Sequence, residues 1–119
     1  MRYLYMALVY VGLLCNTAAF AADPVGRYQV EGGNPGNAGA YRGTVTVQKT
    51  GQTYRVVWTI GATRFVGTGI ETNDFFSVAY AAPDKGFGLA LYRPNGSDWA
   101  GVWTVAGGQT VGWETWKRQ

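Results

Sequence analysis

Trp58-Thr59-Ile60, followed by Val66-Gly67, occurs a second time in the chain, 45 residues later and without a gap, as Trp103-Thr104-Val105 and Val111-Gly112. The same offset places Gly43 on Gly88 and Tyr54 on Trp99. Because these residues suit a pleated, half-buried surface, the repeat predicts a duplicated β unit. We expect its two halves at about residues 26–72 and 73–117.

Residues 41–49 carry the clearest strand pattern. Odd positions from Tyr41 to Val47 are aromatic, small or aliphatic, whereas even positions from Arg42 to Gln48 are polar. A period of two is typical of a sheet with one wet face. Similar alternation recurs between turn signals such as Asn95-Gly96, a hairpin dipeptide. Outside the first residues, no segment has a helical period.

The pattern predicts an all-β fold of eight short strands joined by tight connections. We expect an eight-stranded antiparallel up-and-down meander barrel with an internal two-fold repeat, because closure removes both exposed edges. Such an interior is just filled by side chains or holds one small ligand. Glycines at positions 43, 67, 69, 101 and 112 would leave room for large side chains from neighbouring strands. A β-sandwich is the alternative, because periodicity does not report closure.

Residues 1–21 have the pattern of a signal peptide. A positive start at Met1-Arg2 precedes an apolar run, and Ala19-Phe20-Ala21 offers small residues for cleavage. We expect cleavage after Ala21, a single mature domain over residues 22–119, and export to the periplasm or the medium. An uncleaved anchor and lipidation at Cys15 are less favoured alternatives. Cys15 is the only cysteine, so the mature domain would have no disulfide.

Several function classes lack the residues they need. The chain has no histidine, which excludes a Ser-His-Asp triad and nearly all zinc sites. It also lacks a glycine-rich phosphate loop, and its charges are scattered, so we expect no cofactor, no metal and no nucleic-acid partner. The polar row from Arg42 to Gln48 disfavours a lipid-spanning barrel. We therefore expect no stable membrane insertion after signal cleavage.

Glu114 is the carboxylate that turn chemistry does not explain. Most other acidic residues lie in or beside predicted turns, whereas Glu114 lies within a strand, where the repeat has Gly69. Its side chain would point into a barrel mouth and pair with Arg64 or Arg93, or it would point to solvent. We favour solvent or an ion pair over a catalytic role.

The aromatic residues are the second lead. Trp58 and Trp103 occupy equivalent repeat positions, which favours a shared structural role in the core. Tryptophans found only in the second half are better binding candidates, and we expect Trp116 to be exposed. The repeat also places the loops 32–40 and 83–86 at one end of the barrel. The candidate ligand- or partner-binding residues are Asn34, Tyr41, Trp99, Trp113, Glu114 and Trp116.

Two stretches resemble a known group of proteins. They are residues 26–32 with Asn34-Pro35 and Tyr41-Arg42-Gly43, and residues 99–107 with Gly112 and Glu114. The chain resembles small exported bacterial β proteins rich in glycine and aromatic residues, often labelled fibronectin-binding protein. The resemblance implies an adhesive or binding role and no catalytic residues. The pattern is also similar, in general terms only, to avidin-type barrels, without a residue-by-residue biotin motif.

The sequence thus predicts an exported, non-catalytic binding or structural module, with an unknown protein or small molecule as its partner. Protein binding of the fibronectin-binding kind is the first possibility, and a small-ligand-binding barrel is the alternative. A periplasmic protease inhibitor and a carboxylate hydrolase are less favoured.

Overall fold

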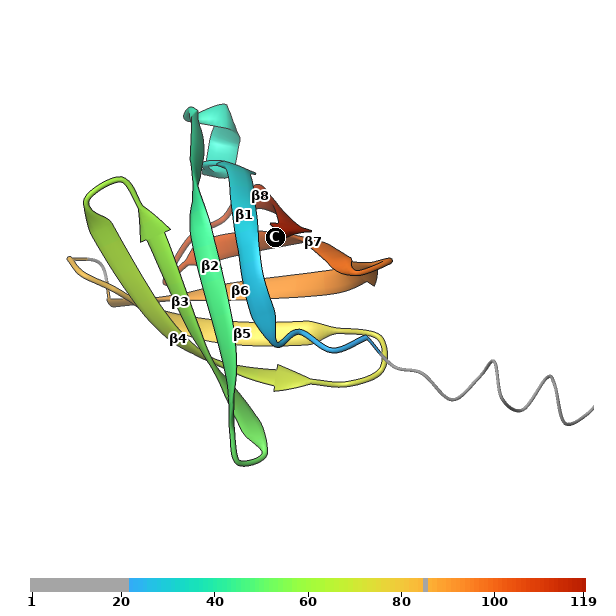
Figure 1. Cartoon of the computed structure of the whole chain (residues 1–119). Helices are drawn as coiled ribbons and strands as arrows, with labels where there is room; N and C mark the ends of the chain where they lie inside the picture. The colour runs from blue at the N-terminus through green and yellow to red at the C-terminus, as the bar shows by residue number, and fades with distance from the viewer. Residues whose placement is uncertain (1–21, 85) are drawn as a thin grey trace, which may run out of the picture.

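The chain folds into a closed barrel in which each strand pairs antiparallel with the next and β8 pairs back with β1 (Figure 1). This computed structural model describes residues 22–84 and 86–119, so the predicted signal peptide and Cys15 lie outside the described residues. The closed up-and-down barrel is confirmed, and the sandwich alternative is wrong. The strands are β1 (Gly26–Gly33), β2 (Ala40–Thr50), β3 (Thr53–Ile60), β4 (Thr63–Glu71), β5 (Phe76–Ala82), β6 (Gly86–Asn95), β7 (Asp98–Val105) and β8 (Gly112–Arg118).

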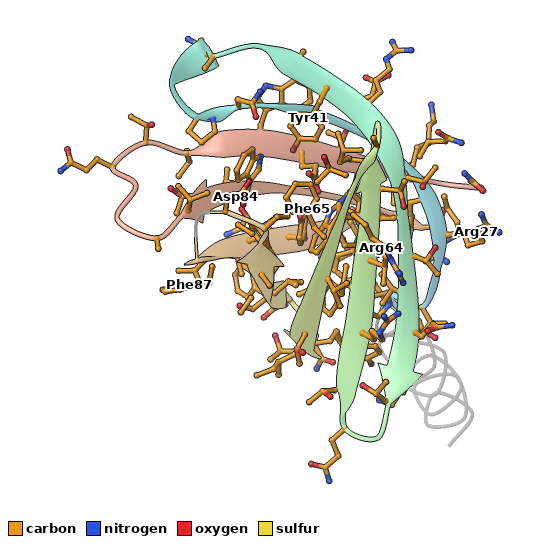
Figure 2. The ribbon with its side chains drawn as sticks, turned by 90° about the vertical axis from the view of Figure 1, so that its left-hand side faces the viewer. Arg27, Tyr41, Arg64, Phe65, Asp84 and Phe87 are labelled. Atoms are coloured by element: carbon orange, nitrogen blue, oxygen red, sulfur yellow. The ribbon has the colours of Figure 1, made fainter. Side chains whose placement is uncertain are left out.

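Alternation along the strands decides which side chains enter the barrel. On β2, Val45 and Val47 are fully buried, while Arg42 is exposed. Figure 2 shows Arg27 and Phe87 projecting away from the barrel, on its outside. The interior is unusually aromatic, because a barrel of eight strands leaves space that large rings can fill. The core residues are Tyr28, Val30, Val45, Val47, Tyr54, Val56, Trp58, Phe76, Val78, Tyr80, Ala90, Tyr92, Trp99 and Trp116.

Glycines face aromatic rings across the strands. Gly32 pairs with Tyr41, and Gly88 pairs with Tyr80. In each pair, a Cβ atom added to the glycine would overlap the ring of its partner. The same holds for Gly112, whose Cβ would collide with the indole of its partner Trp103. The glycines therefore provide the space that the large inward side chains need, as the sequence predicts.

The repeat is preserved in two hairpins and shifts in the last strand. Val45 pairs with Trp58 in the first half, and Ala90 pairs with Trp103 at the equivalent place in the second. Beyond the hairpins, however, Trp58 pairs with Phe65, whereas Trp103 pairs with Gly112. A longer connection between β7 and β8 than between β3 and β4 accounts for this shift of two residues.

The shift changes what Glu114 is equivalent to. An ungapped match aligns it with Gly69, but its strand partner is Gly101. In the first half, the corresponding partner is Val56, which pairs with Gly67. In space, Glu114 therefore occupies the position of Gly67, one inward position closer to the β3–β4 turn than the sequence match suggests.

Both termini of the described chain meet at one end of the barrel. The guanidinium of Arg118 donates hydrogen bonds to the carbonyl oxygens of Asp23, Val25 and Ser97, at 2.8–3.0 Å. It also donates to the Tyr28 hydroxyl at 2.7 Å and lies over the Tyr28 ring. Burial raises the pKa of Tyr28, and the nearby Arg118 charge opposes part of that rise.

The other end carries the predicted pair of loops. The first connects β1 to β2 and contains the short 3-10 helix η1 (Pro35–Asn37), and the second connects β5 to β6. Residues of both loops line the same cavity, so the prediction that they share one end is confirmed. Within the described ranges, no helix is long and apolar enough to span a membrane.

Candidate functional site: an aromatic cavity with a buried carboxylate

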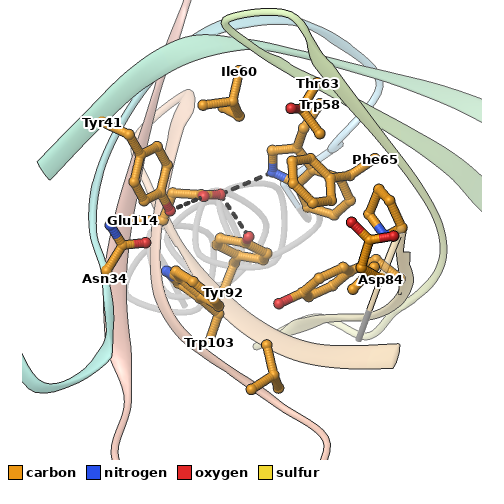
Figure 3. A pocket seen from close by; sticks show the side chains of 14 residues that line it. Asn34, Tyr41, Trp58, Ile60, Thr63, Phe65, Asp84, Tyr92, Trp103 and Glu114 are labelled. Carbon is orange, nitrogen blue, oxygen red and sulfur yellow. Dashed lines mark hydrogen bonds between the residues drawn. The ribbon is translucent and has the colours of Figure 1, made fainter. Parts of the chain in front are cut away.

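A cavity of about 510 Å³ occupies the end of the barrel that carries the two loops (Figure 3). Its walls are formed by inward-facing side chains of the strands and by the loop residues at the mouth. Most of these side chains are aromatic or aliphatic. The lining residues are Asn34, Tyr41, Trp58, Ile60, Thr63, Phe65, Tyr80, Ala82, Pro83, Asp84, Tyr92, Trp103, Val105 and Glu114.

Glu114 lies at the inner part of this cavity, with only 5% of its surface exposed. Its Oε1 atom accepts three hydrogen bonds: from Trp58 Nε1 at 3.0 Å, from the Tyr92 hydroxyl at 2.7 Å and from Trp116 Nε1 at 2.7 Å. Its Oε2 atom accepts one, a short bond from the Tyr41 hydroxyl. Four neutral donors from β2, β3, β6 and β8 therefore converge on one carboxylate.

The expectation that Glu114 points to solvent or joins an ion pair is wrong. Residues 112, 114 and 116 face the interior, and the single ion pair among the described residues joins Arg42 to Glu31 on the surface. Arg93 instead lies over the ring of Phe75. The carboxylate is stabilised by hydrogen bonds to neutral groups, which satisfy a buried polar group without a cation.

The tyrosines around Glu114 hold their protons more tightly than free tyrosine does. Burial is the main cause, and the neighbouring Glu114 carboxylate raises the pKa of Tyr92 and Tyr41 further. The same two causes raise the pKa of Tyr80 to about 12. These hydroxyls therefore remain donors across the ordinary pH range, which fits their role as partners of a carboxylate.

The two repeat-related tryptophans differ in this site. Trp58 is buried and its indole N–H is bonded to Glu114. Trp103 is half-buried, and its Nε1 atom is enclosed without a hydrogen-bond partner among the described residues. Its ring instead packs edge-on against Tyr41 and Tyr80, with centroids 6.2 and 6.5 Å apart. Trp58 is a core residue as predicted, whereas Trp103 belongs mainly to the cavity wall.

The predicted binding residues separate into three groups. Asn34, Tyr41 and Glu114 line the cavity together. Trp99 and Trp116 are buried in the core, with 2% and 1% of their surface exposed, so the predicted exposure of Trp116 is wrong. Trp116 does not line the cavity and contacts the site through its hydrogen bond to Glu114. Trp113 points outward from β8 and is 47% exposed.

Several lining residues were not identified from the sequence. Phe65, Tyr80 and Tyr92 are inward-facing aromatic residues, and Asp84 lies in the loop at the mouth. Strand alternation gives a usable signal for Phe65 and Tyr80, which share a face with Gly67 and Val78 on their own strands. For Tyr92 the signal points the wrong way, because the apolar residues Phe87, Leu89 and Leu91 lie on the opposite, exposed face of β6. Alternation does not indicate which end of the barrel interior is left empty, because that depends on how side chains pack across the barrel.

The cavity is acidic. Among residues 22–84 and 86–119, its lining contains two carboxylates, Asp84 at the mouth and Glu114 inside, and no lysine or arginine. Figure 3 shows Glu114 and Asp84 on opposite sides of the pocket. Within residues 22–84 and 86–119, no group of three or more metal-ligating side chains is placed to hold an ion.

Comparisons with known proteins assign no family to this chain. No protein-family model matches it. No curated protein matches it either. The site therefore has to be interpreted from its own geometry and chemistry.

Proposed function

We propose that this protein is a non-catalytic barrel that binds a small molecule in its open end. The observation that carries the proposal is the cavity of about 510 Å³, walled by aromatic side chains and containing one fixed, buried carboxylate. Ligand pockets in proteins typically measure about 300–1,000 Å³ and combine apolar walls with a few placed polar groups. Arg118 and residues 23–25 lie at the opposite end of the barrel, and loop residues line this cavity, so a ligand would enter beside the two loops.

The chemistry of the carboxylate favours binding over catalysis. Four donors fix Glu114, which leaves it little freedom to approach a reacting atom. The raised pKa values of Tyr41 and Tyr92 keep these hydroxyls protonated, so they are poor general bases near neutral pH. A carboxylate held rigidly by hydrogen bonds is instead suited to orienting a bound ligand.

The export inferred from residues 1–21 is part of the same proposal, because a periplasmic or secreted barrel of this kind would capture a molecule outside the cytoplasm. The resemblance to proteins labelled fibronectin-binding favours a different use of the molecule, through its outer wall. That wall contains neighbouring exposed apolar residues on β6, β7 and β8, namely Leu91, Val102 and Trp113. The cavity supplies the stronger argument, because it combines enclosure with fixed polar groups.

The proposal is tested with N-phenyl-1-naphthylamine, an uncharged aromatic dye that fluoresces in apolar surroundings. We expect saturable binding at one site per barrel and a rise in melting temperature, since a ligand of the folded state stabilises it. Ala82→Trp should abolish both effects, because Ala82 lines the cavity. Ala81→Trp is the matched control: its site is the neighbouring residue on β5, on the exposed outer face.

Two outcomes would contradict the proposal. The absence of saturable binding to the wild-type barrel, both of this dye and of the two phenolic probes described below, would show that the cavity is not a ligand site. Binding that survives Ala82→Trp but is lost on Leu91→Ser would place the apolar site on the outer wall, as the protein-binding alternative requires.

A further inference from the structure

The cavity holds negative charge that the described protein does not neutralise. Glu114 is buried, and all four of its hydrogen-bond donors are uncharged groups. A second carboxylate, Asp84, lies at the mouth, and no arginine or lysine of the described residues lines the cavity. Low-dielectric walls focus such a field, so the potential inside the cavity attracts positive charge.

The two oxygens of Glu114 are unequally occupied. Oε1 accepts three hydrogen bonds, whereas Oε2 accepts only the one from Tyr41. An ionised carboxylate offers about two acceptor positions on each oxygen. Oε2 therefore keeps capacity for a further interaction, and Glu114 is part of the cavity lining.

The walls are aromatic and form a continuous series of ring contacts. Tyr41 packs against Trp103, Trp103 against Tyr80, and Tyr80 against Trp58, with centroids 5.5–6.5 Å apart. Phe65 joins the series through Tyr80 at 6.2 Å. Aromatic faces attract cations through their negative quadrupole, and cages of such rings are an established way to hold quaternary ammonium groups.

We propose that the ligand of this cavity is a small organic cation, with its charged nitrogen held among Tyr41, Tyr80 and Trp103 and directed toward Glu114. This inference rests on the proposed function of a small-molecule-binding barrel. An anionic ligand would meet two carboxylates, and a neutral ligand would leave the field of Glu114 unused.

The test compares two probes of nearly equal shape, (4-hydroxyphenyl)trimethylammonium and the neutral 4-tert-butylphenol. Both are titrated by calorimetry at mildly acidic pH, at which both phenol groups stay protonated. We expect the cation to bind at least about tenfold more tightly, which is within the strength of a desolvated cation–aromatic contact. Glu114→Gln should reduce this preference to about threefold or less, because it removes the buried charge and retains an acceptor oxygen.

A second variant keeps the test valid where Glu114→Gln does not fold. Asp84→Asn changes an exposed residue at the mouth and should weaken cation binding while leaving neutral binding unchanged. Asp74→Asn is its matched control, since Asp74 is an exposed carboxylate in the β4–β5 connection, outside the cavity lining. It should leave both affinities unchanged.

The outcomes separate the two proposals. Equal or tighter binding of 4-tert-butylphenol, or a cation preference unaffected by both Glu114→Gln and Asp84→Asn, would overturn the cation assignment. In that case, continued binding of N-phenyl-1-naphthylamine, sensitive to Ala82→Trp, would still support a small-molecule barrel. Failure of all three probes would overturn both proposals.

Discussion

The hairpins β2–β3 and β6–β7 are equivalent parts of the two repeat halves, and they use equivalent residues differently. Trp58 and Trp103 share a sequence position and the same pairing within their hairpins. Trp58 is hydrogen-bonded to Glu114, while the N–H of Trp103, at the cavity, has no partner in the part of the chain that the structure describes. The difference arises from the shift of β8, which brings Gly112 opposite Trp103 and Glu114 opposite Gly101. The duplication thus explains the equivalent positions of Trp58 and Trp103, and the shift of β8 explains why Glu114 is hydrogen-bonded to only one of them.

The largest effect is expected from replacing Glu114, whose counterpart in the first half is Gly67. Glu114→Ala leaves four buried or part-buried donors without their acceptor. We expect a loss of about 3–5 kcal/mol in the free energy of unfolding, measured by urea denaturation. Glu114→Gln, which retains one acceptor oxygen, should lose clearly less. Equal losses for the two variants would show that the charge of the carboxylate, and not its shape or the acceptor oxygen that glutamine retains, sets the cost.

The repeat-related glycines Gly43 and Gly88 provide a second comparison. A Cβ atom at Gly43 would collide with the backbone carbonyl of Thr59, which cannot move without disturbing the sheet. At Gly88 it would meet the outer end of the Tyr80 ring, beside the open cavity. Gly43→Ala should therefore destabilise the barrel by about 2–3 kcal/mol in urea denaturation, and Gly88→Ala by less. Gly88→Ala should also alter dye binding, because it displaces Tyr80, and a larger stability loss at Gly88 would contradict this reasoning.

The smallest expected effect comes from the two tryptophans themselves. Trp58→Phe removes a donor to a buried carboxylate and should cost about 1.5–3 kcal/mol of unfolding free energy. Trp103→Phe removes a donor that has no partner and should cost less than about 1 kcal/mol. Denaturation of both variants under the same conditions measures the difference. Similar losses would mean that the Trp103 N–H is satisfied in solution.

Much of the fold could be predicted because strand alternation and turn residues are local signals. The pattern from Tyr41 to Val47 and the Asn95-Gly96 turn are read from neighbours in the chain, and both occur in the predicted strands and connections. The closed barrel also matches the prediction, because eight strands of this kind have exposed edges unless they close.

The site was less predictable because it depends on which face of β8 points into the barrel. Trp113 lies on one face of this strand and Trp116 on the other, so hydrophobicity alone did not decide which face is inward. The decision comes from long-range contacts: Trp116 packs against Tyr92 with ring centroids 4.3 Å apart and bonds to Glu114. The ungapped repeat added a misleading alignment, because it matched Glu114 to Gly69.

The hydrogen bonds of Arg118 determine how the barrel is oriented when it is attached to a support through either terminus. Arg118 in β8 is bonded directly to the carbonyl groups of Asp23 and Val25, so both ends of the domain meet at one pole. The cavity mouth is at the other pole. A tether attached beside either residue 22 or residue 119 would leave the mouth directed away from its support. Immobilisation through either terminus should therefore present the same accessible opening to a ligand in solution.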